Sequence, residues 1–490
     1  MHSPFFEACK TVSTKTDQGL LDRRLHRGGF LDRDYDVLVI GSGAAGLSAA
    51  ISAADSGATV LICESEQSVG GSSRLSGGHF YAAGTSVQEK AGTYDDTPDD
   101  MYEHYMTLNQ WMVDPRVVRK YCDLSGPTFE WLMNLGVEFL PEGVYPSGVS
   151  SIPRGHQPTG GGQEVINILE GHRSHKGIDI VLDARVTELI VDSENRIQGV
   201  SIGKDKALCG AAVIATGGFG ANEKLLQSHY PKSQVVGDWS WYIGAKGARG
   251  DGLLLGEAVG GSIDGRDRGL LLVTPGFSQD LEVLFPSWLI LVNKEGRRFA
   301  SESSPYTVLG GLIESQGGSA HAIFDETARI NAKPNSSSQA YWVSDVLEKK
   351  AEEGFIKRAN NIEALAKDIG LEPKALRGTI ENYNKDADLG RDSHFFKEGA
   401  LTKITTPPFY GVEVKPAIIC WTGAGLRIDE KAKVIDKAEK PIPGLFAAGE
   451  TVGNLHGDRY VGGGGSFGPA IVFGKIAGEQ AASFATSRND

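Results

Sequence analysis

The sequence predicts an α/β fold in which a discontinuous Rossmann-like domain is interrupted by an inserted α+β domain. Two observations carry this prediction. A glycine-rich turn joins an apolar strand to a small-residue helix at residues 41–46, and apolar strands that run into glycines return at 211–218 and 444–449. Between these segments, residues 271–420 mix strand-like and helix-like stretches. With 490 residues, the chain is long enough for two or three buried cores.

The first element is a short apolar run, Tyr35–Ile40, whose β-branched residues predict a strand. The turn Gly-Ser-Gly-Ala-Ala-Gly follows directly, then a helix of small residues that ends at Gly57, then a second strand that ends in Glu64. Strand, glycine turn, helix and strand within about 30 residues form a right-handed βαβ unit. The Gly/Ser-rich segment 70–78 is expected to be a loop, and residues 178–203 are expected to form the strands of a meander.

Each glycine of this turn has a role in binding a dinucleotide. Gly41 allows the tight turn, Gly43 lets the backbone approach a pyrophosphate, and Gly46 allows close packing of the helix. The helix N-terminus then faces the phosphates with its free N–H groups. Glu64 follows about 20 residues later, where a carboxylate accepts hydrogen bonds from ribose hydroxyls. A purely structural turn is the alternative, and the complete βαβ context argues against it.

We predict that the cofactor is FAD rather than NAD. Ala215-Thr216-Gly217 after one strand and Gly449-Glu450 after another look like further contact segments of FAD-binding proteins. No second glycine turn of this kind follows a strand, so reducing equivalents are expected to leave to an external electron acceptor. The candidate cofactor-binding residues are Gly41, Gly43, Ala44, Ala45, Gly46, Glu64, Ser65, Gly70, Gly71, Ser72, Ser73, Ser76, Gly77, Gly78, Val186, Ala215, Thr216, Gly217, Asp251, Gly449, Glu450, Ser466 and Phe467.

Composition excludes several classes of function. The formal net charge of −13 argues against nucleic-acid binding, which needs clustered Lys and Arg. The five cysteines are scattered and odd in number, which favours reduced thiols in a cytoplasmic protein. No apolar stretch reaches the roughly 18 residues of a membrane span, so no transmembrane segment is expected. Residues 1–31 are interpreted as an arm before the fold.

Six segments together resemble the fumarate reductase/succinate dehydrogenase flavoprotein superfamily, and the resemblance covers roughly residues 33–485. The resemblance implies a cap domain that closes over the flavin, with the substrate between the two. We therefore expect an FAD-binding domain at 32–270 and 421–490 and a cap/catalytic domain at 271–420. The segments are VIGSGAAGLSAA, GGSSRLSGG, RGHQPTGGG, VIATGGFGAN, VNKEGRRFASE and GLFAAGETVG.

The charged residues by which fumarate reductases hold a dicarboxylate are mostly replaced. Tyr306 stands where that family has an arginine after R-F-x-x-E, and Tyr460 replaces the arginine of H-G-x-N-R. The segment 419–423 lacks the family's histidine. A site without these charges holds a small dianion poorly, so fumarate reduction is disfavoured. His79 is not placed like the flavin-linking histidine of succinate dehydrogenases, so FAD is expected to be non-covalent. His79 and His156 are interpreted as structural, and no metal site is predicted.

Tyrosines at these two positions resemble the FAD-dependent 3-ketosteroid dehydrogenases. The segment from Tyr460 to Ala470 is similar to their Y-x-G-x-G-x-[ST]-x-G-x-A pattern, which implies that the Tyr460 hydroxyl and the Gly464 N–H hold the ketone oxygen. Residues 79–101 look more like the 4,5-desaturating branch than the 1,2-desaturating one, so the bond that is desaturated stays open.

Desaturation of a ketone needs a base for the α-proton, donors for the developing enolate and a hydride acceptor, here N5 of the flavin. Tyr306 is the candidate base, and its anion would need stabilisation because an ordinary tyrosine has a pKa of about 10. Ser466 and Phe467 open the last helix and could stabilise charge on the flavin. The predicted substrate is thus a small apolar cyclic ketone.

Three alternatives remain. One is desaturation of a smaller cyclic ketone such as an oxocyclohexane carboxylate, with Arg459 holding the acid group. Another is a fumarate-reductase-like enoate reductase. The third is a flavin-binding protein without redox turnover, which the paired tyrosines Tyr306 and Tyr460 argue against.

Overall fold

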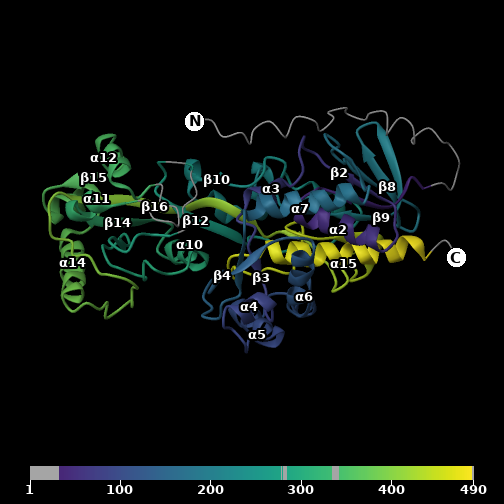
Figure 1. The fold of residues 1–490 in the computed structure, drawn as a ribbon. Coiled ribbons are helices and arrows are strands. Elements are labelled where there is room, and N and C mark those ends of the chain that lie inside the picture. The colour runs from purple at the N-terminus through teal and green to yellow at the C-terminus, as the bar shows by residue number, and fades with distance from the viewer. Residues whose placement is uncertain (1–32, 278, 280–283, 334–340, 488–490) are drawn as a thin grey trace, which may run out of the picture.

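The computed structural model describes residues 33–277, 279, 284–333 and 341–487. The arm expected at residues 1–31 lies outside the described residues. In Figure 1 a large sheet with helices packed on it occupies one end of the molecule, and a second sheet with its own helices occupies the other. The long strand β16 (Phe409–Thr422) runs between them.

A mainly parallel sheet of eight strands forms the centre of the larger part. Its order is β18-β19-β9-β1-β2-β6, and β8 and β7 extend it from β9. β1 pairs in parallel with β2 and with β9, and β9 pairs in parallel with β19. This confirms the predicted α/β class. The strands are β1 (Tyr35–Ile40), β2 (Val60–Cys63), β6 (Asp179–Val181), β7 (Glu188–Val191), β8 (Ile197–Ile202), β9 (Asp205–Ile214), β18 (Lys433–Ile435) and β19 (Pro441–Ala447).

Two helices from opposite ends of the chain pack closely on this sheet. They are α2 (Ala44–Asp55), which follows the first glycine turn, and α15 (Phe467–Thr486). A Cβ at Gly474 would lie 2.4 Å from the Ala45 carbonyl oxygen, and one at Gly478 would lie 2.1 Å from that of Ala49. The two helices can therefore approach this closely only because small residues line their contact.

Two local predictions were wrong. Residues 178–203 were expected to form one meander, but β6 pairs in parallel with β2 and only β7, β8 and β9 form the antiparallel meander. The strand is short, and its sequence does not show which neighbour it will meet. The Gly/Ser-rich segment 70–78, expected as a loop, contains the short helix α3 (Gly71–Leu75).

The smaller part has a six-stranded sheet between two apolar cores. Alternate residues of β13 and β14 face opposite sides. Leu291 and Phe324 join one core with Trp342, and Val292 and Ile323 join the other. Its elements are β10 (Trp241–Tyr242), β12 (Gly269–Thr274), β13 (Ile290–Val292), β14 (Ala320–Asp325), β15 (Lys357–Ala359), β16, α10 (Tyr306–Ser315), α11 (Glu326–Asn331), α12 (Ser344–Glu352), α13 (Ile362–Asp368) and α14 (Pro373–Asp388).

A small antiparallel sheet, β3-β5-β4, stands beside the larger part and has helices of its own. The elements of this region are β3 (Phe80–Tyr81), α4 (Ser86–Lys90), α5 (Pro98–Leu108), α6 (Pro115–Asn134), β4 (Phe139–Tyr145), β5 (Gly155–Pro158) and α7 (Gly161–His175). The remaining elements are α8 (Glu223–His229), η1 (Pro231–Gln234), η2 (Gly237–Trp239), α9 (Asp251–Ala258), β11 (Ile263–Asp264) and β17 (Gly425–Leu426). Within the described ranges, no helix is both long and apolar enough to cross a membrane.

A buried ion pair fixes the small sheet. The Arg154 guanidinium, just before β5, donates to both carboxylate oxygens of Asp96 at 2.6–3.0 Å, and neither side chain is more than 1% exposed. The Gln88 amide donates to the same carboxylate at 2.9 Å. The pair ties the segment before α5 to the strand that carries His156.

Replacing Arg154→Met should lower the free energy of unfolding by about 3–5 kcal/mol, because it leaves the Asp96 carboxylate buried without a partner. Urea denaturation of the FAD-loaded protein measures this loss. The double variant Arg154→Met/Asp96→Leu should recover most of the stability, since no buried charge is left. If Arg154→Met alone is as stable as the wild type, the pair does not hold this region together.

Candidate active site

Of the three glycines in the turn after β1, only Gly43 has open space around its Cα. Gly41 has φ +100°, and a Cβ on it would lie 2.4 Å from the Ala215 carbonyl oxygen. A Cβ at Gly46 would lie 2.0 Å from the Gly41 carbonyl oxygen, so protein packing requires both glycines. A Cβ at Gly43, the N-cap of α2, would meet nothing nearer than the Ser73 hydroxyl oxygen at 3.4 Å. This is a cradle at a helix N-terminus, suited to a phosphate.

Glu64 lies at the end of β2, directly beside this cradle. Its side chain is buried, and Oε2 accepts hydrogen bonds from the backbone N–H of Ser42 at 2.8 Å and from the Ser42 hydroxyl at 2.5 Å. Oε1 accepts from the Glu66 N–H at 2.9 Å. Ser65 is the next residue along the chain, and its hydroxyl contacts Oε1 at 3.3 Å. The carboxylate is thus held in place at the position expected for a ribose contact.

The segment 70–78 forms the second wall of the cradle. The Ser73 hydroxyl accepts from the N–H of Ala44 at 3.1 Å, and the Ser72 hydroxyl accepts from the N–H of Ala245 at 3.0 Å. A Cβ at Gly78 would lie 2.6 Å from the Gly162 N, because this segment packs against the start of α7. Gly71, also expected to contact the cofactor, has open space around it, because a Cβ there would have no neighbour within 4 Å.

The third and fourth expected contact segments end neighbouring strands of the same sheet. Ala215, after β9, donates its N–H to the Ile40 carbonyl at 2.8 Å, and Gly217 has φ +73° with open space around it. Glu450, after β19, is half-buried, and its Oε1 accepts from the N–H and the hydroxyl of Thr422 at 2.9 and 2.8 Å. Burial raises the pKa of the Glu450 carboxyl.

Two further residues expected to bind the cofactor, Asp251 and Thr216, have partners within the protein. The Asp251 carboxylate pairs with the Arg185 guanidinium at 2.7 Å, and burial raises the pKa of Asp251. Arg185 precedes Val186, whose side chain is buried. The pair lies close to Thr216, because the Thr216 hydroxyl accepts from the N–H of Gly252 at 3.0 Å.

These segments fit an FAD. The bare Cα of Gly43 beside a helix N-terminus suits the pyrophosphate, and the fixed Glu64 carboxylate suits a ribose. A small pocket lies between Glu450 and the start of α15, and Trp421, His456 and Ser466 also line it. Ser466 is the N-cap of α15, so the last helix begins where the sequence predicted.

The structure brings Tyr306 and Tyr460 together. Tyr306 is the first residue of α10, and Tyr460 lies in the glycine-rich segment before α15. Both rings pack against one apolar cluster made of Leu270, Leu272, Ile418 and Trp421. The Tyr460 hydroxyl accepts a hydrogen bond from the N–H of Ser466 at 2.9 Å, which leaves its own proton free to donate.

Burial makes both phenols weak acids. It raises the pKa of Tyr306 well above the ordinary value, and the nearby Tyr460, Tyr145 and Cys420 raise it further. The pKa of Tyr460 is also raised by burial, although the Ser466 N–H works against the shift. Both tyrosines are therefore protonated at neutral pH.

Gly464 is held by direct backbone contact with the small sheet. Its φ is +94°, and a Cβ on it would lie 2.5 Å from the Tyr81 N of β3. The neighbouring Gly463 donates its N–H to the Ser147 hydroxyl at 2.6 Å. Gly464, which is expected to supply the second oxyanion donor, is thus positioned by β3 and by Ser147, just after β4.

Two residues of this site were missed by the sequence analysis. The Tyr145 hydroxyl forms a short hydrogen bond with Nδ1 of His79, and it lies close enough to Tyr306 and Tyr460 to affect their pKa values. No motif marks Tyr145, and His79 was interpreted as structural. Only the tertiary contact with the segment at Gly463, more than 300 residues later, reveals them.

His456 and Arg459, which lie near Tyr460, both form hydrogen bonds to other groups of the protein. His456 is buried, its Nδ1 bonds to the Tyr105 hydroxyl at 2.8 Å, and burial lowers its pKa to about 3, so the ring is neutral. Arg459 is exposed, and its guanidinium donates to the Asp458 carbonyl at 3.3 Å near Gly311 of α10. The described residues contain no cluster of three or more His, Cys, Asp or Glu that could hold a metal ion.

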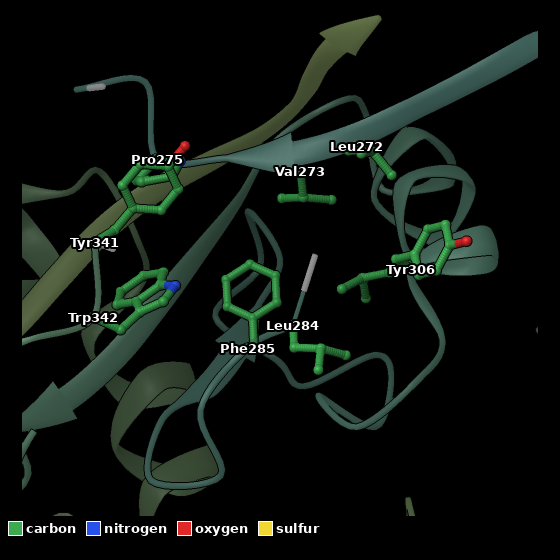
Figure 2. Close-up of a pocket in the computed structure, with 9 residues that line it drawn as sticks. Leu272, Val273, Pro275, Leu284, Phe285, Tyr306, Tyr341 and Trp342 are labelled. Carbon is green, nitrogen blue, oxygen red and sulfur yellow. The ribbon is translucent and has the colours of Figure 1, made fainter. Parts of the chain in front are cut away.

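A small apolar pocket adjoins Tyr306 on the side of the second sheet. Figure 2 shows the Tyr306 ring at one edge, with its hydroxyl pointing away from the other lining side chains. Phe285, Tyr341 and Trp342 supply aromatic surface opposite it. The pocket is also lined by Leu272, Val273, Pro275, Leu284 and Leu309.

A family model described as "FAD binding domain" matches residues 36–466. The fumarate reductase (cytochrome) of Shewanella frigidimarina is 32% identical over 463 residues, which cover 92% of this chain and 77% of that protein. The vinyl phenol reductase of Lactiplantibacillus plantarum is 29% identical, with 92% of this chain and 97% of that protein covered.

Among solved structures, the 3-ketosteroid-Δ4-(5α)-dehydrogenase of Rhodococcus jostii RHA1, in complex with 4-androstene-3,17-dione, has a TM-score of 0.76 and 27% identity. The match covers 92% of this chain and 98% of that one. The chain therefore belongs to the FAD binding domain family, within the fumarate reductase/succinate dehydrogenase flavoprotein superfamily, and is a flavin-dependent oxidoreductase.

Proposed function

We propose that this flavoprotein desaturates a cyclic ketone, with a 3-ketosteroid as the expected substrate. The observation that supports this most is the meeting of Tyr306 and Tyr460 on one apolar wall, beside a pocket lined by apolar and aromatic side chains. A steroid is apolar except at its oxygens, so such a wall suits its ring system and two phenols suit its ketone. The similar dehydrogenase of Rhodococcus jostii, solved with a steroid, agrees with this proposal.

The cradle residues would hold FAD without a covalent bond. Gly41, Gly43 and the N-terminus of α2 would bind the pyrophosphate, Glu64 a ribose, and Glu450 and Ser466 the flavin end. Bound FAD would supply the hydride acceptor, at N5.

Tyr460 and Gly464 would hold the ketone oxygen. Because the Tyr460 oxygen already accepts from Ser466, its proton is directed toward another acceptor. The Gly464 N–H, on a backbone fixed against β3, would be the second donor. Two fixed donors stabilise the enolate that forms when the α-proton leaves, and they do so most effectively where water is excluded.

Tyr306 would exchange the α-proton with the substrate. Its raised pKa keeps the phenol protonated at neutral pH, which is the starting state for giving a proton, and also makes it a weak acid. This observation favours a second candidate function, the reduction of a C=C bond conjugated to a ketone, with the same donors and the same tyrosine in the opposite direction. The similarity to a vinyl phenol reductase agrees with that candidate.

The position of Arg459 argues against a small keto acid. Its guanidinium is exposed beside α10 and bonds to the chain's own backbone, so its charge is not directed at Tyr460. An anaerobic panel of saturated and unsaturated 3-ketosteroids and monocyclic ketones tests the proposal. Bleaching of oxidised flavin by a saturated ketone supports desaturation, and reoxidation of reduced flavin by an enone supports reduction. A panel with neither response contradicts both.

Glu64→Ala should weaken FAD binding by about 2 kcal/mol, because it removes charge-assisted hydrogen bonds to the ribose. Fluorescence titration of the apoprotein with FAD measures the dissociation constant. Glu64→Gln is the matched variant, since it keeps an acceptor for the Ser42 N–H and removes only the charge. Acid precipitation should release all the flavin. Flavin retained on the precipitate, or unchanged affinity in both variants, would overturn these assignments.

Fumarate and succinate should not be turned over, because Tyr306 and Tyr460 replace the arginines that hold a dicarboxylate. Stopped-flow mixing of dithionite-reduced enzyme with fumarate measures this directly. Reoxidation as fast as with the best enone would show that the site binds small dianions after all.

Tyr460→Phe should slow flavin reduction by the ketone about 10²–10³-fold, because it removes one oxyanion donor and keeps the ring. Tyr306→Phe should be at least as damaging, since no other titratable group is assigned to the α-proton. Single-turnover reduction, monitored by flavin absorbance, is the measurement. Both variants should keep bound FAD, and Tyr94→Phe, at an exposed position, is the control. Near wild-type rates in both site variants would refute the proposed function.

A further inference from the structure

Three polar side chains gather over the bare Cα of Gly463. A Cβ on this residue would lie 2.3 Å from the Tyr145 hydroxyl, 3.3 Å from the Ser147 hydroxyl and 3.4 Å from Nδ1 of His79. His79 comes from the segment before β3, and Tyr145 and Ser147 from the end of β4. Gly463 precedes Gly464, the proposed oxyanion donor, so the cluster lies directly at the ketone site.

The polar contacts of this cluster form a chain from Gly463 to His79. The Gly463 N–H donates to the Ser147 oxygen at 2.6 Å. Ser147 lowers the pKa of Tyr145, and in the proposed arrangement its hydroxyl donates to the phenol oxygen. The Tyr145 proton is then left for Nδ1 of His79, with which it forms a short bond. This arrangement requires an imidazole whose Nδ1 is unprotonated.

We propose that His79 is a positioning residue of the ketone site, whose unprotonated Nδ1 fixes the Tyr145 hydroxyl beside Tyr306 and Tyr460. The inference rests on the proposed function. When His79 takes a proton from solvent on Nδ1, that nitrogen becomes a donor and Tyr145 can no longer donate to it. The phenol must then turn its proton toward Ser147 or the tyrosines, and the chain that ends at Gly463 is broken. Protonation of His79 therefore disturbs the ketone site.

The surroundings of His79 support a neutral ring at pH 7. Burial lowers its pKa below the ordinary 6.5, and no charged neighbour among the described residues offsets this. Tyr145 is the titratable group that faces it, edge to face at 5.4 Å between ring centroids. Burial raises the pKa of Tyr145 to about 12, so the phenol keeps its proton. The expected loss of activity thus lies on the acid side, below pH 6.5.

The first test is the pH profile of flavin reduction by the best ketone. In the wild type, the rate should fall about tenfold per pH unit below the pKa of His79, since one protonation switches the site off. His79→Gln should lower the rate at pH 7.5 by up to about 100-fold, as small misplacements of catalytic groups do, and should abolish the acid limb. His321→Gln is the matched control, because burial also lowers the pKa of that half-buried histidine and it lies on β14. An acid limb unchanged in His79→Gln overturns the proposal.

The second test needs no substrate. In the ¹⁵N NMR spectrum of the FAD-loaded, histidine-labelled protein at pH 7.5, His79 should be the neutral tautomer with its proton on Nε2. Tyr145→Phe should shift the Nδ1 resonance of His79 and leave that of His321 unchanged. A proton on Nδ1, or no response to Tyr145→Phe, overturns the proposal. If no ketone reduces the flavin, the proposed function fails, and this spectrum still decides the bond to Tyr145.

Discussion

The site depends on how closely the backbone of residues 462–464 approaches β3 and β4. A Cβ at Gly462 would lie 2.6 Å from the Ser147 hydroxyl, and one at Gly464 2.5 Å from the Tyr81 N. Both glycines also have φ between +90° and +150°, a conformation that side chains disfavour. This contact places Tyr460 and Gly464 relative to the small sheet and brings Tyr145 and His79 to the same point. The run of four glycines at 462–465 is therefore a steric requirement of the site as well as part of a family pattern.

The local parts of this structure could be predicted from the sequence. The βαβ unit at Tyr35, the Glu64 carboxylate beside its turn and the start of α15 at Ser466 each depend on residues close together in the chain. The strand β6 could not be placed, because a three-residue strand carries no information on its partner. Tyr145 and His79 could not be found either, since only the fold brings them to Gly463. Tyr306 and Tyr460 were found from the pattern around them, whereas the bond between Tyr460 and Ser466 emerged from the structure.

The charges of the site explain why one scaffold can serve different chemistries. In this chain the positions proposed to meet the substrate carry neutral phenols, a neutral His456 and apolar side chains. Placing a dianion there would desolvate it without a compensating charge. A neutral ketone carries little desolvation cost, and its charge develops only during the reaction, where fixed donors act most strongly. Under the proposed function, the exchange of arginine for tyrosine would change the class of substrate without a change of fold.

The long strand β16 has a consequence for how the site is assembled. It pairs with β12, β10, β14 and β15, so one continuous strand runs through the second sheet. Tyr306 stands on α10, which packs on this sheet, whereas Tyr460 is anchored to the small sheet through its glycines. The two phenols proposed to transfer the proton and to hold the ketone oxygen are thus fixed by different segments, and both pack against the same cluster on β12 and β16. Under the proposed function, the alignment of the two phenols would therefore depend on how the small sheet β3-β5-β4 and the strands β12 and β16 pack together.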